Sequence, residues 1–128
     1  MYENKESILA TKSFDFSKRI IKMVDYLYKN ADPKFSSIYQ QVLRSGTSIS
    51  ANISESQFAQ SRADFITKLH IAAKEANETK NWLKMLHENG TLTLTQFQSM
   101  DADCSEILAL LVASLNTAKR NEQNNKRD

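Results

Sequence analysis

The sequence predicts an all-α protein, folded as an antiparallel up-down-up-down four-helix bundle, and three observations carry this prediction. The 128-residue chain contains only two Gly and one Pro, which is too few for a sheet built on tight turns. Apolar residues recur at intervals of three and four along four segments, the period of a helix with one buried face. Short connections separate these segments, so consecutive helices are expected to pack as antiparallel neighbours. A single domain over residues 1–128 is expected.

The first helix is expected over about 14–31. Its inward face carries Phe16, Ile20, Val24 and Leu27. Pro33 disfavours the helical conformation at Asp32 and therefore ends this helix.

The second and third helices are expected over about 38–59 and 62–88. Ser37 with Gln40, and Ser61 with Asp64, each resemble a capping box that starts a helix. Gly90 ends the third helix, because Gly readily adopts the left-handed conformation that follows a last helical turn.

The fourth helix is expected over about 94–120, started by a capping box at Thr93 and Gln96. Its inward positions step by three and four like a coiled-coil seam. Further apolar residues lie beside that seam, which predicts a second buried face and contact between subunits. The interface candidates are Leu108, Leu110 and Val112. The polar tail over 121–128 is expected to be frayed or disordered.

A polar constellation is the strongest candidate for chemistry. Arg44, Ser48, Asn52 and Glu55 share one face of the second expected helix, and Glu75 and Glu78 lie one turn apart on the third. A paired-carboxylate or metal site is one reading. A di-iron bundle needs a Glu-x-x-His pair on two helices, and neither histidine follows a Glu at that spacing. The favoured reading is an ion-pair and amide network that sets helix register, with a ligand or partner contact as the alternative.

The sequence gives no support for an enzyme, a cofactor, a metal or a small-molecule substrate. The two Gly residues, Gly46 and Gly90, lie too far apart in the sequence to form a Gly-x-Ser-x-Gly elbow or a phosphate-binding loop. The single cysteine, Cys104, falls on the seam and is interpreted as a core residue. It cannot form an internal disulfide, so a cytoplasmic location is expected. No signal peptide is recognised, and the longest apolar run is too short to span a membrane.

Basic residues cluster twice, and both clusters are candidates for nucleic-acid contact: Lys18, Arg19 and Lys22, and then Lys119 and Arg120. The alternative is a solvated surface balanced by nearby carboxylates. A net charge of +2 does not by itself indicate a nucleic-acid partner.

The run from Gln41 to Glu55 strongly resembles the signature of a bacterial four-helix-bundle family. This family was first noted as proteins encoded by intervening sequences in 23S ribosomal RNA genes. The run contains Arg44-Ser45 with Ser48-Ile49, followed by Ala51-Asn52-Ile53 and Glu55. The third segment is similar to the family pattern at Glu75, Glu78, Thr79 and Trp82. Ser50 and Ser56 depart from it, since Gly is common at both positions.

The resemblance implies a non-enzymatic protein that forms a ring-like homo-oligomer, typically a pentamer. It also implies a relation to the accessory variability protein of diversity-generating retroelements, which binds nucleic acid and a reverse transcriptase. We therefore expect an oligomeric bundle that associates with RNA or a nucleoprotein partner. The alternative is a protein–protein scaffold without nucleic-acid binding.

Overall fold

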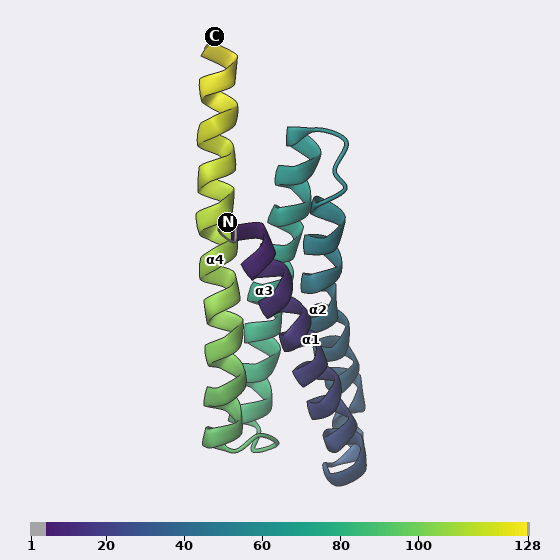
Figure 1. Cartoon of the computed structure of the whole chain (residues 1–128). Coiled ribbons are helices and arrows are strands. Elements are labelled where there is room, and N and C mark those ends of the chain that lie inside the picture. The colour runs from purple at the N-terminus through teal and green to yellow at the C-terminus, as the bar shows by residue number, and fades with distance from the viewer. Residues whose placement is uncertain (1–4, 128) are drawn as a thin grey trace.

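The described part of the chain folds into four long helices, an all-helical fold as the sequence predicts. The computed structural model describes residues 5–127, with the side chains of residues 8–124. The helices are α1 (Lys5–Asn30), α2 (Ser36–Ser56), α3 (Arg62–Glu88) and α4 (Leu94–Arg127), and a short 3₁₀ turn, η1 (Pro33–Phe35), precedes α2. Each helix packs on its neighbours in the chain, and α1 also contacts α4 (Figure 1). The ends of the expected domain, residues 1–4 and 128, lie outside the described range.

The start of α1 corrects the sequence prediction, because the helix begins at Lys5 rather than near residue 14. Leu9 is fully buried in the core, and Ser13, about one helical turn later, is buried as well. These two positions continue the inward face of Phe16 by about two more turns. Burial of Leu9 therefore stabilises a helical segment that lacks a strong start signal of its own.

The start of α2 also differs from the prediction. The expected capping box at Ser37 does not form, since the residue that precedes the helix is Phe35, which makes no side-chain capping bond. Asp32 instead accepts a hydrogen bond from the Lys34 amide at 3.0 Å and caps η1. Because η1 leads directly into α2, Ser37 lies inside the first turn of that helix and does not occupy the N-cap position. The helix also ends at Ser56, before the expected boundary at residue 59.

Both ends of α3 and the start of α4 lie where capping residues in the sequence predict them. The Ser61 hydroxyl accepts a hydrogen bond from the Asp64 amide at 3.0 Å. Thr93 and Gln96 form a reciprocal capping box, with bonds of 2.9 and 3.2 Å. At the other end of α3, Gly90 has φ of +86°, and the Thr91 amide bonds the Leu86 carbonyl at 2.9 Å. That bond identifies a Schellman motif.

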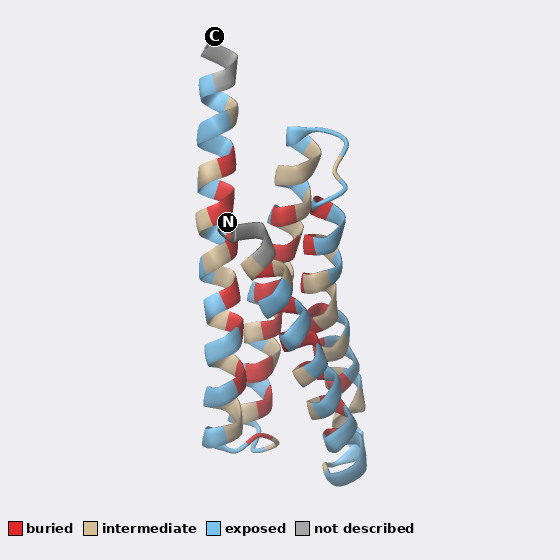
Figure 2. Ribbon diagram, in the orientation of Figure 1, coloured by how far each residue is buried: buried red, intermediate tan, exposed pale blue. Residues whose placement is uncertain are grey.

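The end of α4 also corrects the sequence prediction. The expected disordered tail is helical through Arg127, and it projects beyond the other three helices (Figure 1). No Pro or Gly interrupts this segment, and Lys, Arg, Glu and Gln are good helix formers. Of residues 119–124, all but Glu122 are exposed (Figure 2).

The core lies between the inward faces of all four helices (Figure 2). Its largest fully buried side chains include Tyr39, Phe16 and Ile20. The Tyr39 hydroxyl donates a hydrogen bond to the Asp32 carbonyl at 2.8 Å, which satisfies its polar end inside the fold. None of the described helices combines the length and apolar character needed to cross a membrane.

Candidate functional site

The polar run of α2 is a close-packing surface. A methyl group at Gly46 would lie 2.8 Å from Cγ1 of Ile20 on α1, so the absence of a side chain lets the two helices approach. On the same side of α2, the Ser50 hydroxyl lies 2.8 Å from that of Ser17. Ser50 and Ser56, the two departures from the resemblance noted above, both make hydrogen bonds; the Ser56 hydroxyl donates to the Ile53 carbonyl of its own helix at 2.6 Å. The small residues of the run therefore serve helix packing.

The other side of α2 carries an ion-pair network with α3. The Arg44 guanidinium donates to Glu75 Oε2 at 3.1 Å and also to Glu78, and its Nε donates to Gln41 at 3.1 Å. The indole N–H of Trp82 donates to Glu78 at 2.8 Å. The guanidinium group of Arg44 thus bridges two carboxylates that lie one turn apart on α3, and this bridge sets the register of α2 against α3. The Arg44 side chain is 47% exposed, so each pair contributes at most about 1 kcal/mol.

The remaining signature residues do not join this network. Ser48 bonds the Arg44 carbonyl at 2.7 Å, and Asn52 bonds the Ser48 carbonyl at 2.8 Å, both within their own helix. Glu55 pairs with Lys68 of α3 at 2.9 Å, and this contact raises the pKa of Lys68. The six predicted residues therefore fall into three groups. Arg44, Glu75 and Glu78 form the bridge between α2 and α3. Ser48 and Asn52 bond their own helix, and Glu55 forms a separate ion pair with Lys68.

A buried hydroxyl pair was missed by the sequence analysis. The hydroxyls of Ser45 and Thr79 lie 2.8 Å apart, and both residues are fully buried. Thr79 also lies 2.8 Å from the Glu75 carbonyl oxygen. The available signal was that Thr79 falls on the inward face of α3, three residues after Ala76.

Cys104 is a core residue, as the sequence predicts. It is fully buried, and its Sγ lies 3.3 Å from the Ala76 carbonyl oxygen. Burial raises the pKa of this thiol to about 12, so the reactive thiolate is scarce at neutral pH. No group of three or more potential metal ligands is found among the described residues.

Most basic side chains of α1 are already paired with carboxylates. Lys18 pairs with Asp15 at 3.2 Å, and Arg19 pairs with Asp103 of α4 at 2.5 Å. Lys22 forms no ion pair with a described carboxylate. Of the three expected nucleic-acid contacts on α1, only Lys22 keeps an uncompensated charge.

Lys119 and Arg120 lie on the projecting end of α4, where both are exposed and neither pairs with a described carboxylate. Sixteen residues separate Lys119 from Asp103, the partner of Arg19. That separation is about 24 Å along a helix, so the structure does not bring the two basic clusters together.

The three interface candidates on α4 differ in exposure. Leu108 and Leu110 are partly buried against the subunit's own core, whereas Val112 is 45% exposed. Larger apolar side chains are exposed elsewhere, including Phe14 and Ile21 on α1 and Phe58 after α2.

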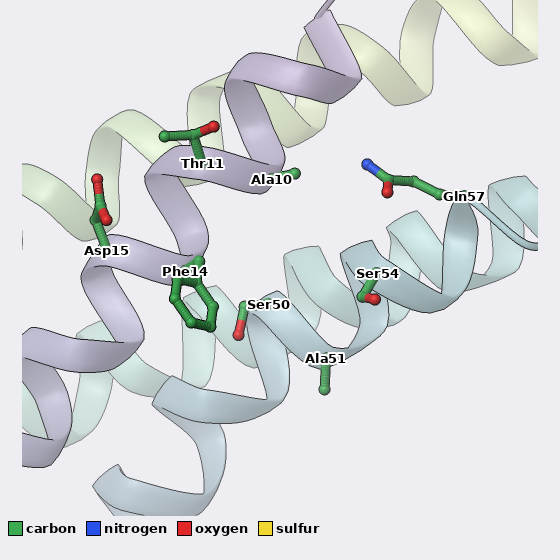
Figure 3. A pocket seen from close by; sticks show the side chains of 8 residues that line it. All are labelled: Ala10, Thr11, Phe14, Asp15, Ser50, Ala51, Ser54 and Gln57. Carbon is green, nitrogen blue, oxygen red and sulfur yellow. The ribbon is translucent and has the colours of Figure 1, made fainter.

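The surface carries several hollows. One of about 550 Å³ lies between α1 and α2 and is lined by Phe14, Ser50 and Gln57 among others (Figure 3). Asp15 is the one charged residue in its lining, and its carboxylate points away from α2 (Figure 3). A second hollow, of about 450 Å³, lies between α1 and the start of α4.

Comparison with known proteins identifies the family. Residues 5–113 match the family model of the 23S rRNA-intervening sequence protein. The chain is 42% identical to a crystal structure from Bacteroides thetaiotaomicron VPI-5482, described as a protein with unknown function from the S23 ribosomal protein family. That similarity has a TM-score of 0.82 and covers 88% of this chain and 99% of the other. No curated protein gives a significant match. The chain therefore belongs to the 23S rRNA-intervening sequence protein family.

Proposed function

We propose that this protein is a non-enzymatic, cytoplasmic oligomer of four-helix bundles that associates with RNA or with a nucleoprotein partner. One observation carries the RNA association: the projecting end of α4 presents Lys119 and Arg120 without a described carboxylate partner. The same helix continues through Lys126 and Arg127 in the sequence. Exposed cations on a helix that extends beyond the bundle can contact the phosphates of a nucleic acid and release the counterions bound to those phosphates.

The proposed assembly is an antiparallel up-down-up-down bundle that forms a ring-like homo-oligomer, with the pentamer favoured by the family resemblance. The contact between Tyr28 near the end of α1 and Tyr39 near the start of α2 supports the reversal of direction there. The Lys80–Asp101 ion pair, 2.8 Å long, supports the same reversal between α3 and α4. Exposed Phe14, Ile21 and Val112 provide apolar surface for subunit contact. Sedimentation equilibrium tests the assembly, and a monomer at micromolar concentration would contradict it.

RNA association is tested by fluorescence anisotropy with a structured RNA fragment at several salt concentrations. The affinity is expected to fall as salt rises. In the double variant Lys119→Gln/Arg120→Gln the slope of log K against log salt is expected to decrease by about 1.8, because each duplex phosphate contact contributes about 0.9. Lys29→Gln is the matched control, since Lys29 pairs with Asp25 at 2.9 Å on α1. Absence of binding at low salt, or binding indifferent to salt, would refute the association.

A protein–protein scaffold without nucleic acid is the second candidate. The exposed aromatic side chains favour it, above all Phe58, which is 83% exposed in the connection between α2 and α3. Affinity purification after nuclease treatment, with and without Phe58→Ser, tests this alternative. Recovery of a defined protein partner that depends on Phe58, from protein that fails the RNA titration, would establish it.

A further inference from the structure

A hollow between α1 and the start of α4 is lined by apolar, aromatic, cationic and uncharged polar side chains. It has a volume of about 450 Å³, within the range of ligand pockets in proteins. α1 packs less extensively on α4 than on α2. Figure 1 shows the two helices diverging toward the connection between α3 and α4. The hollow lies in this widening, between the Arg19–Asp103 ion pair and the connection from α3 to α4.

The floor of the hollow is apolar and one wall is aromatic. Leu92 and Met100 are almost fully buried, with 3% and 5% exposure, and Met23 is partly buried beside them. Tyr26 is 53% exposed, and its hydroxyl makes no hydrogen bond with a described residue. An exposed aromatic ring beside an apolar floor suits a planar, aromatic ligand group that stacks on it.

The charge of the hollow is positive. Arg19 and Lys22 line it, and no carboxylate does. Arg19 is held in place by Asp103 and by the Ser99 hydroxyl, at 2.5 and 2.8 Å, whereas Lys22 remains uncompensated. Because Lys22 precedes Tyr26 by one helical turn, its ammonium group can hold an anion beside a group that stacks on the ring.

The opposite rim offers hydrogen-bonding groups at the start of α4. The Gln96 amide oxygen accepts a bond from the Thr93 amide at 2.9 Å. Its NH₂ group makes no bond with a described residue, and neither does the Thr95 hydroxyl. These groups can read the donor and acceptor edge of a base.

We infer that this hollow holds one nucleotide of a single-stranded RNA, with its base stacked on Tyr26 and its phosphate at Lys22. The inference rests on the proposed association with RNA and assigns it a second contact surface, separate from the end of α4. A nucleotide combines a π-face, a hydrogen-bonding edge and an anion, which matches the aromatic wall, the polar rim and Lys22.

The test measures binding of two probes, a short labelled oligoadenylate and AMP, by anisotropy and by ¹³C NMR of the methionine methyl groups. Tyr26→Ala is expected to weaken oligoadenylate binding by about 5- to 150-fold, the effect of losing one stacked base, and Tyr26→Phe should retain it. Lys22→Gln should lower the salt slope by about 0.7, one single-strand phosphate contact. Both probes should shift the Met23 and Met100 methyl signals.

The matched controls are Phe14→Ala, an exposed aromatic on another face of α1, and Lys18→Gln, a cation already paired with Asp15. Neither should change binding. Circular dichroism confirms that each variant remains helical.

Each other outcome overturns a defined part of the reasoning. Oligoadenylate binding that depends on Lys119 and Arg120 but not on Tyr26 or Lys22 would overturn this site and leave the proposed function intact. AMP bound as tightly as oligoadenylate would reject single-stranded RNA as the source of the nucleotide. No binding of either probe, with structured RNA also unbound at low salt, would overturn both the site and the proposed function.

Discussion

Replacing Gly46 with Ala tests whether the polar run of α2 is a packing surface. The added methyl carbon would lie 2.8 and 2.9 Å from Cγ1 and Cγ2 of Ile20, and 3.1 Å from its Cδ1. Ile20 is fully buried, and its branched Cβ restricts it to one strongly preferred rotamer in a helix. The side chain therefore cannot rotate away, and α1 and α2 have to separate slightly.

Two opposing effects set the magnitude. Ala stabilises a helix interior by about 1 kcal/mol relative to Gly. Overpacking a core costs about 1–3 kcal/mol. The free energy of unfolding should therefore fall by up to about 2 kcal/mol, although helix propensity alone predicts a rise.

A double-mutant cycle with Ile20→Ala isolates the contact. Ile20→Ala alone should cost about 2–5 kcal/mol because it leaves a cavity. In the double variant the new methyl group enters that space, so the total loss should be smaller than the sum of the two by more than about 0.5 kcal/mol. Urea denaturation at fixed protein concentration measures all three variants.

Gly90→Ala is the control for the cycle. No atom lies within 4 Å of its added methyl group, and its φ of +86° strains any other residue. It should destabilise by about 1–2 kcal/mol and show no coupling to Ile20→Ala. If Gly46→Ala stabilises the protein by about 1 kcal/mol, or if its effect simply adds to that of Ile20→Ala, the packing argument is refuted.

Substitutions at three further positions test buried polar groups. Tyr39→Phe removes the donor to the Asp32 carbonyl and should cost about 0.5–1.5 kcal/mol in urea denaturation; an unchanged midpoint would contradict this. Thr79→Val leaves the buried Ser45 hydroxyl without its side-chain partner and should cost about 1–3 kcal/mol, whereas Thr79→Ser should recover much of that loss. The pKa of the Cys104 thiol is raised from 9.0 to about 12 in the folded state, so the unfolded chain loses this proton first. Its stabilising contribution is complete below pH 9 and declines between pH 9 and 12, by up to about 1.4 kcal/mol per pH unit. Parallel pH profiles for wild type and Cys104→Ala would refute that assignment.

Helix boundaries were predictable where a local signal marks them. α3 begins and ends where expected because Ser61 caps its start and Gly90 adopts a left-handed conformation after its end. The start of α1 has no comparable signal, and burial of Leu9 decides it. The end of α4 has no stop signal, so the helix continues through a segment whose polar composition had indicated disorder.

The sequence predicted only part of the candidate site, because contacts between two helices depend on their relative register. Helical spacing placed Arg44, Glu75 and Glu78 on faces that could meet, and they do. The same spacing grouped Glu55 with them, but Glu55 lies farther along α2 and meets Lys68 instead. The spacing of residues within one helix predicts which face they share. The axial register of one helix against another depends on how the two helices pack.

The sequence by itself determined the all-helical class, the signature run and the helix ends that carry caps, because these depend on residues close together in the chain. The tertiary structure decided which cations stay uncompensated, because Arg19 is paired by Asp103, which is distant in the sequence, whereas Lys22 and Lys119 have no carboxylate partner among the described residues. It also decided that Tyr26 and Lys22 line one hollow together with Leu92 and Met100, because α1 and α4 diverge there (Figure 1).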